Sequence, residues 1–501
     1  MRRTGTLVPC AIALACLVML AQFHLREIVA SSIQYDDAHN ANVAKDLAFG
    51  SGYTTSYHEL VPFNPEATTG PVVLLPAAAF VWLFGNQYWV PTFAVVVCLW
   101  TALGVVLFLL RRYLEPRAWW ITAALIAFGL ALFDSDEFGL LGDVPGALLA
   151  VAAVLILCQQ NMCGRIWRAG LLLGIAIQIK LLVLLLAPAA LAYILATPSS
   201  NRRRDIVLFC GAVILPTVLW ELGQLVSMGS FHDWAALNAR QFAFIRTWSG
   251  VNIVQTMDAA AAARRQIALH VSSLLEDFHG WAPLLLFPAA LVISVGVLLR
   301  AGRQDDAPLR SASLVLVAAG IIHLIWWFTL DTDGWFRHLL PGVVYVLVAV
   351  SMAAAANSTL SLRLGAAGLC LLLASMIPQL SNLNHVFRPF RPEPRLSALL
   401  ATRDEMIALQ KNHDFVFVGY GWWVPRDLEY VLPTVGNFKD VLRLRKADVA
   451  GKTVVLVRNE FFNREHSPYM SAFQRACDRG VLFTREPFVI SACPSLPGDL
   501  R

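Results

Sequence analysis

The sequence predicts an α-helical polytopic membrane protein of about 11 transmembrane helices, followed by a small α/β domain. Three observations support this prediction. Hydrophobic residues make up 57% of the 501-residue chain and charged residues only 15%, a balance outside that of soluble domains. Apolar runs of about 17 to 25 residues, each long enough to cross a ~30 Å hydrocarbon core, recur up to about residue 379. After that point, short β-branched runs alternate with helical patterns.

The arginines set the expected topology. Clusters such as Arg2-Arg3, Arg111-Arg112 and Arg202-Arg203-Arg204 flank the apolar runs, and the positive-inside rule places them in the cytoplasm. They account for the net charge of +5, which needs no nucleic-acid partner. The first run has no clear small-residue cleavage site, so we interpret it as an uncleaved span rather than a signal peptide. The expected spans are residues 6–25, 90–110, 118–133, 144–160, 165–179, 181–197, 206–226, 281–299, 311–330, 338–356 and 363–379.

The apolar stretch 71–85 does not fit a chain in which successive connections alternate between the two sides of the membrane. If it crossed the membrane, Arg111-Arg112 would lie outside. We therefore expect a helix in the outer interface, favoured by Trp82 and punctuated by Pro71 and Pro76. The alternative is a true span, and on either interpretation the preceding loop, residues 26–70, is extracytoplasmic.

That first outer loop contains two adjacent acids, Asp36 and Asp37. Carboxylates are costly near hydrocarbon, so a pair at a membrane face is a candidate functional site. The alternative is a hydrophilic loop that simply contains acids. The other outer segments also carry polar residues, whereas the cytoplasmic connections are short and basic, so an active site is expected to face outwards.

Residues 381–501 are expected to form an extracytoplasmic α/β domain behind a Pro/Arg-rich linker. Two of the nine cysteines, Cys477 and Cys493, fall in this domain, and a disulfide between them is permitted there. The other seven lie in spans or at their cytoplasmic ends. No Cys/His set has zinc spacing, and no Gly-rich phosphate loop is present.

Five motifs, in this order and on this side of the membrane, resemble those of the GT-C membrane glycosyltransferases. That group includes the protein O-mannosyltransferases and the bacterial lipid A aminoarabinose transferase. The resemblance covers roughly residues 6–380, which would form the catalytic transmembrane domain, and implies a GT-C-like fold. The motifs are Asp36-Asp37-Ala38 with Gly50-x-Gly52-Tyr53, Glu66-Ala67-Thr68-Thr69-Gly70-Pro71-Val72, Gly142-Asp143-Val144-Pro145, Gly170-x-x-x-Gly174 leading to Gln178-Ile179-Lys180, and Trp335-Phe336-Arg337-His338-Leu339-Leu340-Pro341.

The resemblance implies transfer of a monosaccharide from a polyprenyl-phosphate donor to an acceptor hydroxyl at the outer face. Asp36 would be the base that takes the acceptor proton, in a displacement that inverts the sugar. Asp37 would orient the acceptor or assist a metal. Several relatives carry Asp-Glu where this chain has Asp-Asp, which leaves the use of the second acid open.

The leaving phosphate needs cations, because negative charge on it grows during transfer. Arg337 is the first candidate and Lys180 the second, with His338 beside Arg337. Arg337 has an alternative role as a partner for Asp331 or Asp333, and Lys180 as a lysine snorkelling from a helix end. His338 has the alternative of an interfacial histidine without a chemical role.

Asp143 and Glu66 are candidates for substrate binding. Asp143 has two further alternatives, as a metal ligand or as a cap for its helix. A divalent metal is possible, with His58, Glu59 and Glu66 as candidate ligands, since hard cations take carboxylates and imidazole.

Taken together, these features predict a glycosyltransferase of a bacterial inner membrane, with its site and C-terminal domain facing the periplasm. Its expected partners are the bilayer, a polyprenyl-phosphate sugar donor, and a lipid, glycan or protein acceptor, with no nucleic acid. A secondary transporter or lipid flippase is the alternative, but such proteins usually place ions near the midplane within related repeats.

Overall fold

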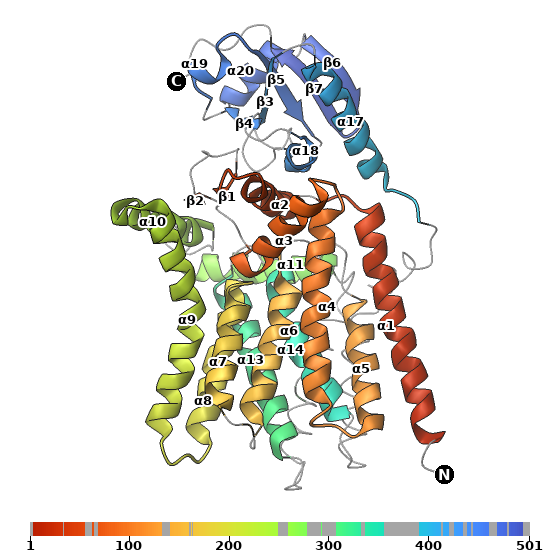
Figure 1. The fold of residues 1–501 in the computed structure, drawn as a ribbon, viewed down its shortest axis with the longest axis vertical. Helices are drawn as coiled ribbons and strands as arrows, with labels where there is room; N and C mark the ends of the chain where they lie inside the picture. Colours follow the sequence, from red (N-terminus) through yellow and green to blue (C-terminus); the bar gives the residue numbers. More distant parts are fainter. Residues whose placement is uncertain are drawn as a thin grey trace.

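The computed structural model describes residues 4–33, 35–55, 63–64, 69–132, 141–159, 162, 164–248, 259–277, 292, 307–331, 336–354, 390–411, 414–419, 425–433, 438–441, 444–459, 468–477 and 480–493. They form a bundle of helices with a C-terminal sheet region at one end (Figure 1). The helices of the bundle are α1 (Thr4–Ala30), α4 (Val90–Leu110), α5 (Pro116–Leu130), α6 (Asp143–Cys158), α7 (Arg165–Ile177), α8 (Ala187–Ala196), α9 (Arg202–Met228), α13 (Ala307–Thr329) and α14 (Phe336–Ala354).

The bundle has the character of a membrane domain. Four helices in the described part of the chain are long and apolar enough to span a membrane: Thr6–Ala30, Val90–Leu110, Arg202–Met228 and Ala307–Thr329. Shorter apolar helices pack among them. The most central is α6, which is buried along nearly its whole length and contacts α4, α7, α13 and α14. The prediction of an α-helical polytopic membrane protein is therefore confirmed.

The sixth expected span, residues 181–197, differs from a continuous helix. It opens as the 3₁₀ helix η2 (Leu181–Leu186) and becomes α-helical only at Ala187. Pro188 lies in the first turn of α8, where its missing N–H costs no helical hydrogen bond, so the α-helix can begin there. The expected spans 281–299 and 363–379 lie outside the described residues apart from Val292, so the number of eleven stays a prediction.

The first outer loop contains a helix that the sequence interpretation missed. Residues Tyr35–Ala48 form α2, with Asp36 and Asp37 in its first turn and Lys45 in its last. Acids at the N-terminus and a cation at the C-terminus complement the helix dipole. A helix is present at the expected position, α3 (Pro71–Phe84), and lies beneath α2 (Figure 1). Its placement in the outer interface stays a prediction. Two residue pairs, in β1 (Tyr53–Thr54) and β2 (Phe63–Asn64), form a short parallel ladder beside α2 (Figure 1).

Two more helices occur within the expected outer segment 227–280. They are α10 (Phe231–Trp248) and α11 (Ala259–Asp277). α10 leaves the bundle sideways at the end of α9 (Figure 1). The end of the bundle that carries α2, α3 and the sheet region is called the capped end below.

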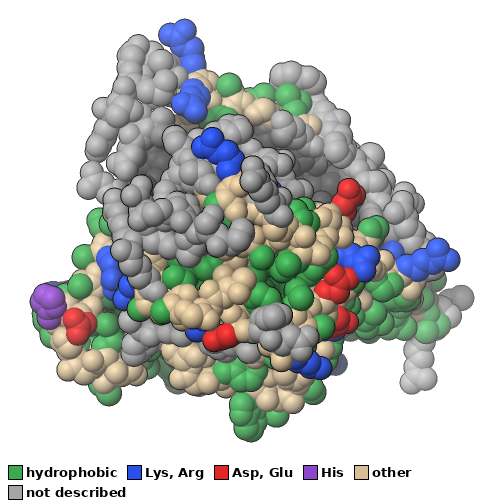
Figure 2. All heavy atoms as spheres, turned by 90° about the horizontal axis from the view of Figure 1, so that it is seen from above, with side chains coloured by type: hydrophobic (Ala, Val, Ile, Leu, Met, Phe, Trp, Pro, Cys, Tyr) green, Lys and Arg blue, Asp and Glu red, His purple; other side chains and the backbone are tan. Residues whose placement is uncertain are grey.

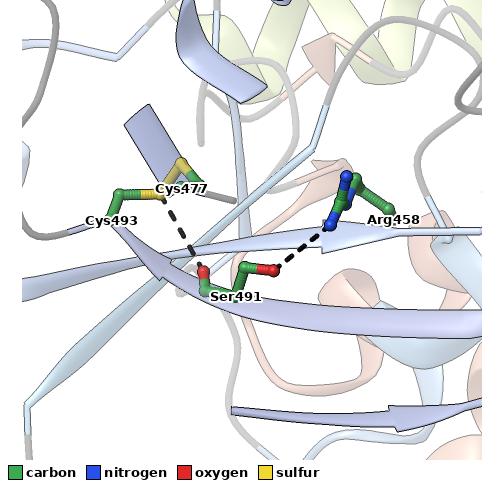
Figure 3. Close-up of a disulfide and its surroundings, with 4 residues drawn as sticks. All are labelled: Arg458, Cys477, Ser491 and Cys493. Atoms are coloured by element: carbon green, nitrogen blue, oxygen red, sulfur yellow. Dashed lines mark hydrogen bonds between the residues drawn. A yellow bond between two sulfur atoms is a disulfide. The ribbon is translucent and has the colours of Figure 1, made fainter. Parts of the chain in front are cut away.

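The C-terminal region has the expected α/β character. Its five-stranded sheet has the order β4-β3-β5-β7-β6, with β3, β4 and β5 parallel and β7 antiparallel to both of its neighbours, β5 and β6. The strands are β3 (Phe415–Gly419), β4 (Phe438–Asp440), β5 (Thr453–Arg458), β6 (Val481–Arg485) and β7 (Phe488–Cys493), and the helices are α17 (Pro394–Gln410), α18 (Arg426–Val431), α19 (Lys446–Val449) and α20 (Pro468–Cys477). Cys477 at the end of α20 and Cys493 at the end of β7 form a disulfide (Figure 3).

The sheet region is packed onto the bundle rather than joined to it by the linker alone. One hydrophobic cluster continues from α2 and α3 into α17, α18 and the sheet, with Ala38, Val73, Leu396, Met406 and Phe488 among its members. At the linker, the Glu393 N–H donates to the Ala30 carbonyl at 2.9 Å. Burial of a shared apolar surface fixes the sheet region over the acid-bearing helix α2.

Candidate active site

Asp36 and Arg337 meet at the capped end of the bundle. Asp36 lies in the first turn of α2 and Arg337 in the first turn of α14. Arg337 Nη2 donates to Asp36 Oδ2 at 2.8 Å. The Arg337 and Asp36 side chains are 23% and 16% exposed, so the pair is shielded from water without being sealed from it. The two residues assigned by resemblance to phosphate binding and proton removal are thus in direct contact.

Asp37 follows in the same turn of α2. Its side chain projects about 100° further round the helix than that of Asp36, and one of its carboxylate oxygens is buried. The two acids therefore point in different directions from one helix end. A role for Asp37 in orienting an acceptor or assisting a metal stays a prediction.

A second ion pair lies deeper. Lys180 Nζ is 3.1 Å from Asp143 Oδ2, and the two side chains are only 8% and 2% exposed. Lys180 is held inside the fold rather than extended to a membrane surface. Asp143 is the first residue of α6, and the N-cap position belongs to Gly142, so Asp143 does not cap its helix. The two residues stabilise each other's charge in a site with little water.

The Thr69-Gly70-Pro71 motif connects this buried pair to α2. The Gly70 N–H donates to the Ile179 carbonyl at 2.9 Å, directly before Lys180. A Cβ atom on Gly70 would lie 2.0 Å from the Gln178 carbonyl oxygen, so only glycine permits this approach. Asn40 Nδ2 of α2 donates to Thr69 Oγ1 at 3.1 Å. Three motifs that are far apart in the sequence therefore form one continuous contact.

His338 lies beside Arg337 but has a partner of its own. His338 Nδ1 is 3.0 Å from Asp331 Oδ2. The buried ring of His323 donates from Nε2 to the His338 carbonyl at 2.6 Å. Asp331, one of the expected alternative partners of Arg337, thus contacts His338, and Asp333 lies outside the described residues. His323, which sequence reasoning missed, holds the start of the helix that carries Arg337.

The metal candidates cannot be placed. His58, Glu59 and Glu66 lie outside the described residues. The substrate-binding role expected of Glu66 therefore stays a prediction. Within the described part of the chain, no group of three or more His, Cys, Asp or Glu side chains could hold a metal ion.

Lys45 is a further residue that sequence reasoning missed. It is buried at the end of α2, and its Nζ donates to the carbonyls of Glu429 at 2.6 Å and Leu432 at 2.7 Å. Burial lowers the pKa of Lys45 to about 8, although the charges of Glu429 and Asp46 act in the opposite direction. In the sequence, Lys45 looks like an ordinary lysine at a helix end, because its partners are 384 and 387 residues away.

The charges of the site are largely internal. Seen from the capped end, basic and acidic side chains are scattered among apolar ones and gather in no single-sign patch where the structure describes the surface (Figure 2). Burial in a low-dielectric setting makes each of the internal charges act more strongly on its neighbours.

Comparisons with known proteins agree with this architecture. A crystal structure of ArnT from Cupriavidus metallidurans in the apo state aligns over 98% of both chains, with 14% identity and a TM-score of 0.58. ArnT is a GT-C lipid A aminoarabinose transferase. The chain has the GT-C fold. A second structure of the same ArnT, bound to undecaprenyl phosphate, aligns over 98% of both chains with 14% identity and a TM-score of 0.47.

A family model described as dolichyl-phosphate-mannose-protein mannosyltransferase matches residues 68–220. This range of the GT-C fold runs from just before α3 into α9 and contains Gly70 and the Asp143–Lys180 pair. Asp36 and Arg337 lie outside it. A search of curated proteins finds no match.

The arrangement offers a carboxylate and a guanidinium at one site. A guanidinium can hold two phosphate oxygens at once, and a carboxylate released from it can accept a proton. The contact between Asp36 and Arg337 brings a carboxylate and a guanidinium within one hydrogen bond of each other.

Proposed function

We propose that the protein is a membrane glycosyltransferase that moves a monosaccharide from a polyprenyl-phosphate donor to an acceptor hydroxyl. The single observation that carries this proposal is the hydrogen bond between Arg337 and Asp36. The partial match to a dolichyl-phosphate-mannose transferase family supports the donor class, because that family's name describes a sugar on a polyprenyl phosphate.

The reaction begins when the donor phosphate competes with Asp36 for the Arg337 guanidinium. The freed Asp36 carboxylate then takes the proton of the acceptor hydroxyl. A bond forms between the acceptor oxygen and the anomeric carbon, and the bond from that carbon to the phosphate oxygen breaks on the opposite side. The configuration at the anomeric carbon is inverted. The polyprenyl phosphate leaves with an additional negative charge, which the Arg337 guanidinium stabilises.

The remaining residues have supporting roles in this proposal. His338, fixed by Asp331, lies next to Arg337 and lines the phosphate side of the site. Lys180 contributes positive charge from beneath, and its partner Asp143 keeps it in place. Asp37 orients the acceptor, which is a hydroxyl of a lipid, a glycan or a protein.

The positive-inside pattern supports an orientation with the capped end away from the cytoplasm, which in a bacterial inner membrane is the periplasm. Both donor and acceptor would then be met outside the cytoplasm. The disulfide between Cys477 and Cys493 is compatible with such an oxidising compartment.

The test uses purified protein in lipid nanodiscs with a panel of radiolabelled polyprenyl-phosphate sugars. Wild type should release free polyprenyl phosphate from one donor, and Asp36→Asn should reduce that rate by roughly 10²- to 10⁴-fold, the usual contribution of a general base. Asp404→Asn, a change of the same kind at an exposed ion pair on α17, should leave the rate unchanged.

Three outcomes would contradict the proposal. Turnover that survives Asp36→Asn would remove Asp36 as the base. Failure to cleave any donor would remove the glycosyltransferase assignment. Movement of an intact donor between the two leaflets would instead support a flippase.

A further inference from the structure

The helix α11 runs across the bundle below α3 in Figure 1 and contacts α13 and α14. Its anchor is His270, which is fully buried. The His270 ring packs against Trp327 at a centroid distance of 4.4 Å and against Phe328 at 5.7 Å. Its Nδ1 lies 2.6 Å from the Gln266 carbonyl, one turn earlier in the same helix. Aromatic packing therefore fixes α11 to the last turn of α13 next to Gln266.

The Gln266 side chain reaches the backbone at the end of α13. Its Nε2 donates to the Phe328 carbonyl at 3.3 Å and to the Asp331 carbonyl at 3.0 Å. The last carbonyls of a helix have no partner within the helix, so a donor from another element can satisfy them. Asp331 lies two residues beyond the last residue of α13, Thr329. One amide from α11 thus fixes the backbone at Asp331.

Asp331 extends this contact to the candidate active site. The residue is only 4% exposed, and its Oδ2 lies 3.0 Å from His338 Nδ1. An ionised carboxylate only accepts hydrogen bonds, so this nitrogen of His338 carries the proton. Asp331 holds His338 at its ring, and His323 holds it at its carbonyl. The residue directly before His338 in α14 is Arg337.

We propose that Gln266 is a positioning residue of the donor-phosphate site, which acts through Asp331 and His338 at the start of α14. The inference rests on the proposed function, in which Arg337 and His338 meet the donor phosphate. Gln266 holds the Asp331 backbone, and the Asp331 carboxylate holds the His338 ring. Without the amide donor the carboxylate shifts, and the groups at the start of α14 lose their alignment with the phosphate.

The contacts separate this role from a general contribution to stability. The apolar anchor of α11 is His270, whereas the Gln266 amide contributes hydrogen bonds to two carbonyls. Met and Lys have helix propensities close to that of Gln, so replacing Gln266 by either residue leaves α11 itself intact. The two substitutions differ in one respect, since Met has no donor and Lys has one.

The experiment titrates a short-chain polyprenyl phosphate, and separately the matching polyprenol, into full-length protein in detergent. The ratio of the two dissociation constants isolates the contribution of the phosphate, and a loss of stability alone does not change that ratio in folded protein. Gln266→Met should reduce the preference for the phosphate about 10-fold, the loss expected when one hydrogen bond to a charged group is removed. Gln266→Lys should retain most of the preference.

Two further variants test the route through Asp331. Ser272→Ala is the matched control, because it removes a side-chain hydrogen bond to the Leu269 carbonyl that stays within α11. Its preference should equal that of wild type. Asp331→Ala should reduce the preference by about the same factor as Gln266→Met. In the double variant, Gln266→Met should add almost nothing, because the route is already interrupted.

The outcomes are distinct. An unchanged preference in folded Gln266→Met would overturn the positioning role, and so would losses that add in the double variant. An unchanged preference in Asp331→Ala would overturn it even where Gln266→Met does not fold. In each of these cases a wild-type preference for the phosphate would still support the proposed function. A wild type that binds the phosphate and the alcohol equally would overturn both.

Discussion

The two ion pairs at the capped end differ in how far they are buried. The Asp36–Arg337 pair keeps side-chain exposures of 16% and 23%, whereas the Asp143–Lys180 pair keeps 2% and 8%. Removing ions from water costs several kcal/mol each, so a deeply buried pair is held together by the loss that either partner would suffer alone. A pair still near water can exchange its partner for a phosphate. Exposure thus distinguishes the pair suited to chemistry from the pair suited to holding the fold.

The largest test of this difference is Arg337→Gln. It removes the guanidinium from the partly exposed pair and should reduce donor cleavage by roughly 10²- to 10³-fold, as the loss of a preorganised charge does at comparable sites. The cleavage rate of Arg337→Lys should lie between those of wild type and Arg337→Gln, because an ammonium keeps the charge but lacks the planar guanidinium that binds two phosphate oxygens. Lys180→Met should be assayed alongside, in folded protein. If it slowed cleavage more than Arg337→Gln, the assignment of chemistry to the partly exposed pair would be wrong.

The buried pair should show its importance in stability. Lys180→Met leaves the Asp143 charge buried without its cation, which should lower the free energy of unfolding by about 3–5 kcal/mol. The double variant Asp143→Asn, Lys180→Met should recover much of that loss, because no charge remains to be compensated. Denaturant unfolding in matched detergent measures both. Equal losses in the single and the double variant would count against a charge-based explanation.

The smallest expected effect concerns the framework beside the buried pair. Gly70→Ala places a methyl group against the Gln178 carbonyl and should cost about 1–3 kcal/mol, typical of overpacking. Gly223→Ala is the control, since open space surrounds that position in α9. The apparent melting temperature of each variant, together with its donor-cleavage rate, would show whether the framework affects only stability.

The sequence predicted the bundle well because apolar length is a local property. The expected span 90–110 coincides with α4, and local motifs also mark Asp36 and Arg337 as candidate site residues. Their pairing could not be predicted, because 301 residues separate the two side chains. The expected alternative, Arg337 with Asp331 or Asp333, was the choice that proximity in sequence favours.

The errors have physical causes that the sequence partly displays. The helix α2 was interpreted as loop because it is short and polar, although acids in its first turn and Lys45 in its last turn are a helix signal. The buried contacts of Lys45 gave no signal in the sequence, since its acceptors are backbone carbonyls 384 and 387 residues away. Long-range docking of this kind is specified by the whole fold rather than by any motif.

The contact of Lys45 with the carbonyls of Glu429 and Leu432 also sets an order of events during biosynthesis. Lys45 leaves the ribosome 384 residues before the Glu429 carbonyl that it binds. At ~5–20 residues per second, that interval lasts roughly 20 to 80 seconds. Arg337 follows Asp36 after only 301 residues, so for the last part of that time Lys45 still lacks its acceptors although Arg337 has already been synthesised. A chain cut short within the region between residues 394 and 429 would therefore contain both Asp36 and Arg337 but would leave Lys45 without the carbonyl acceptors of Glu429 and Leu432.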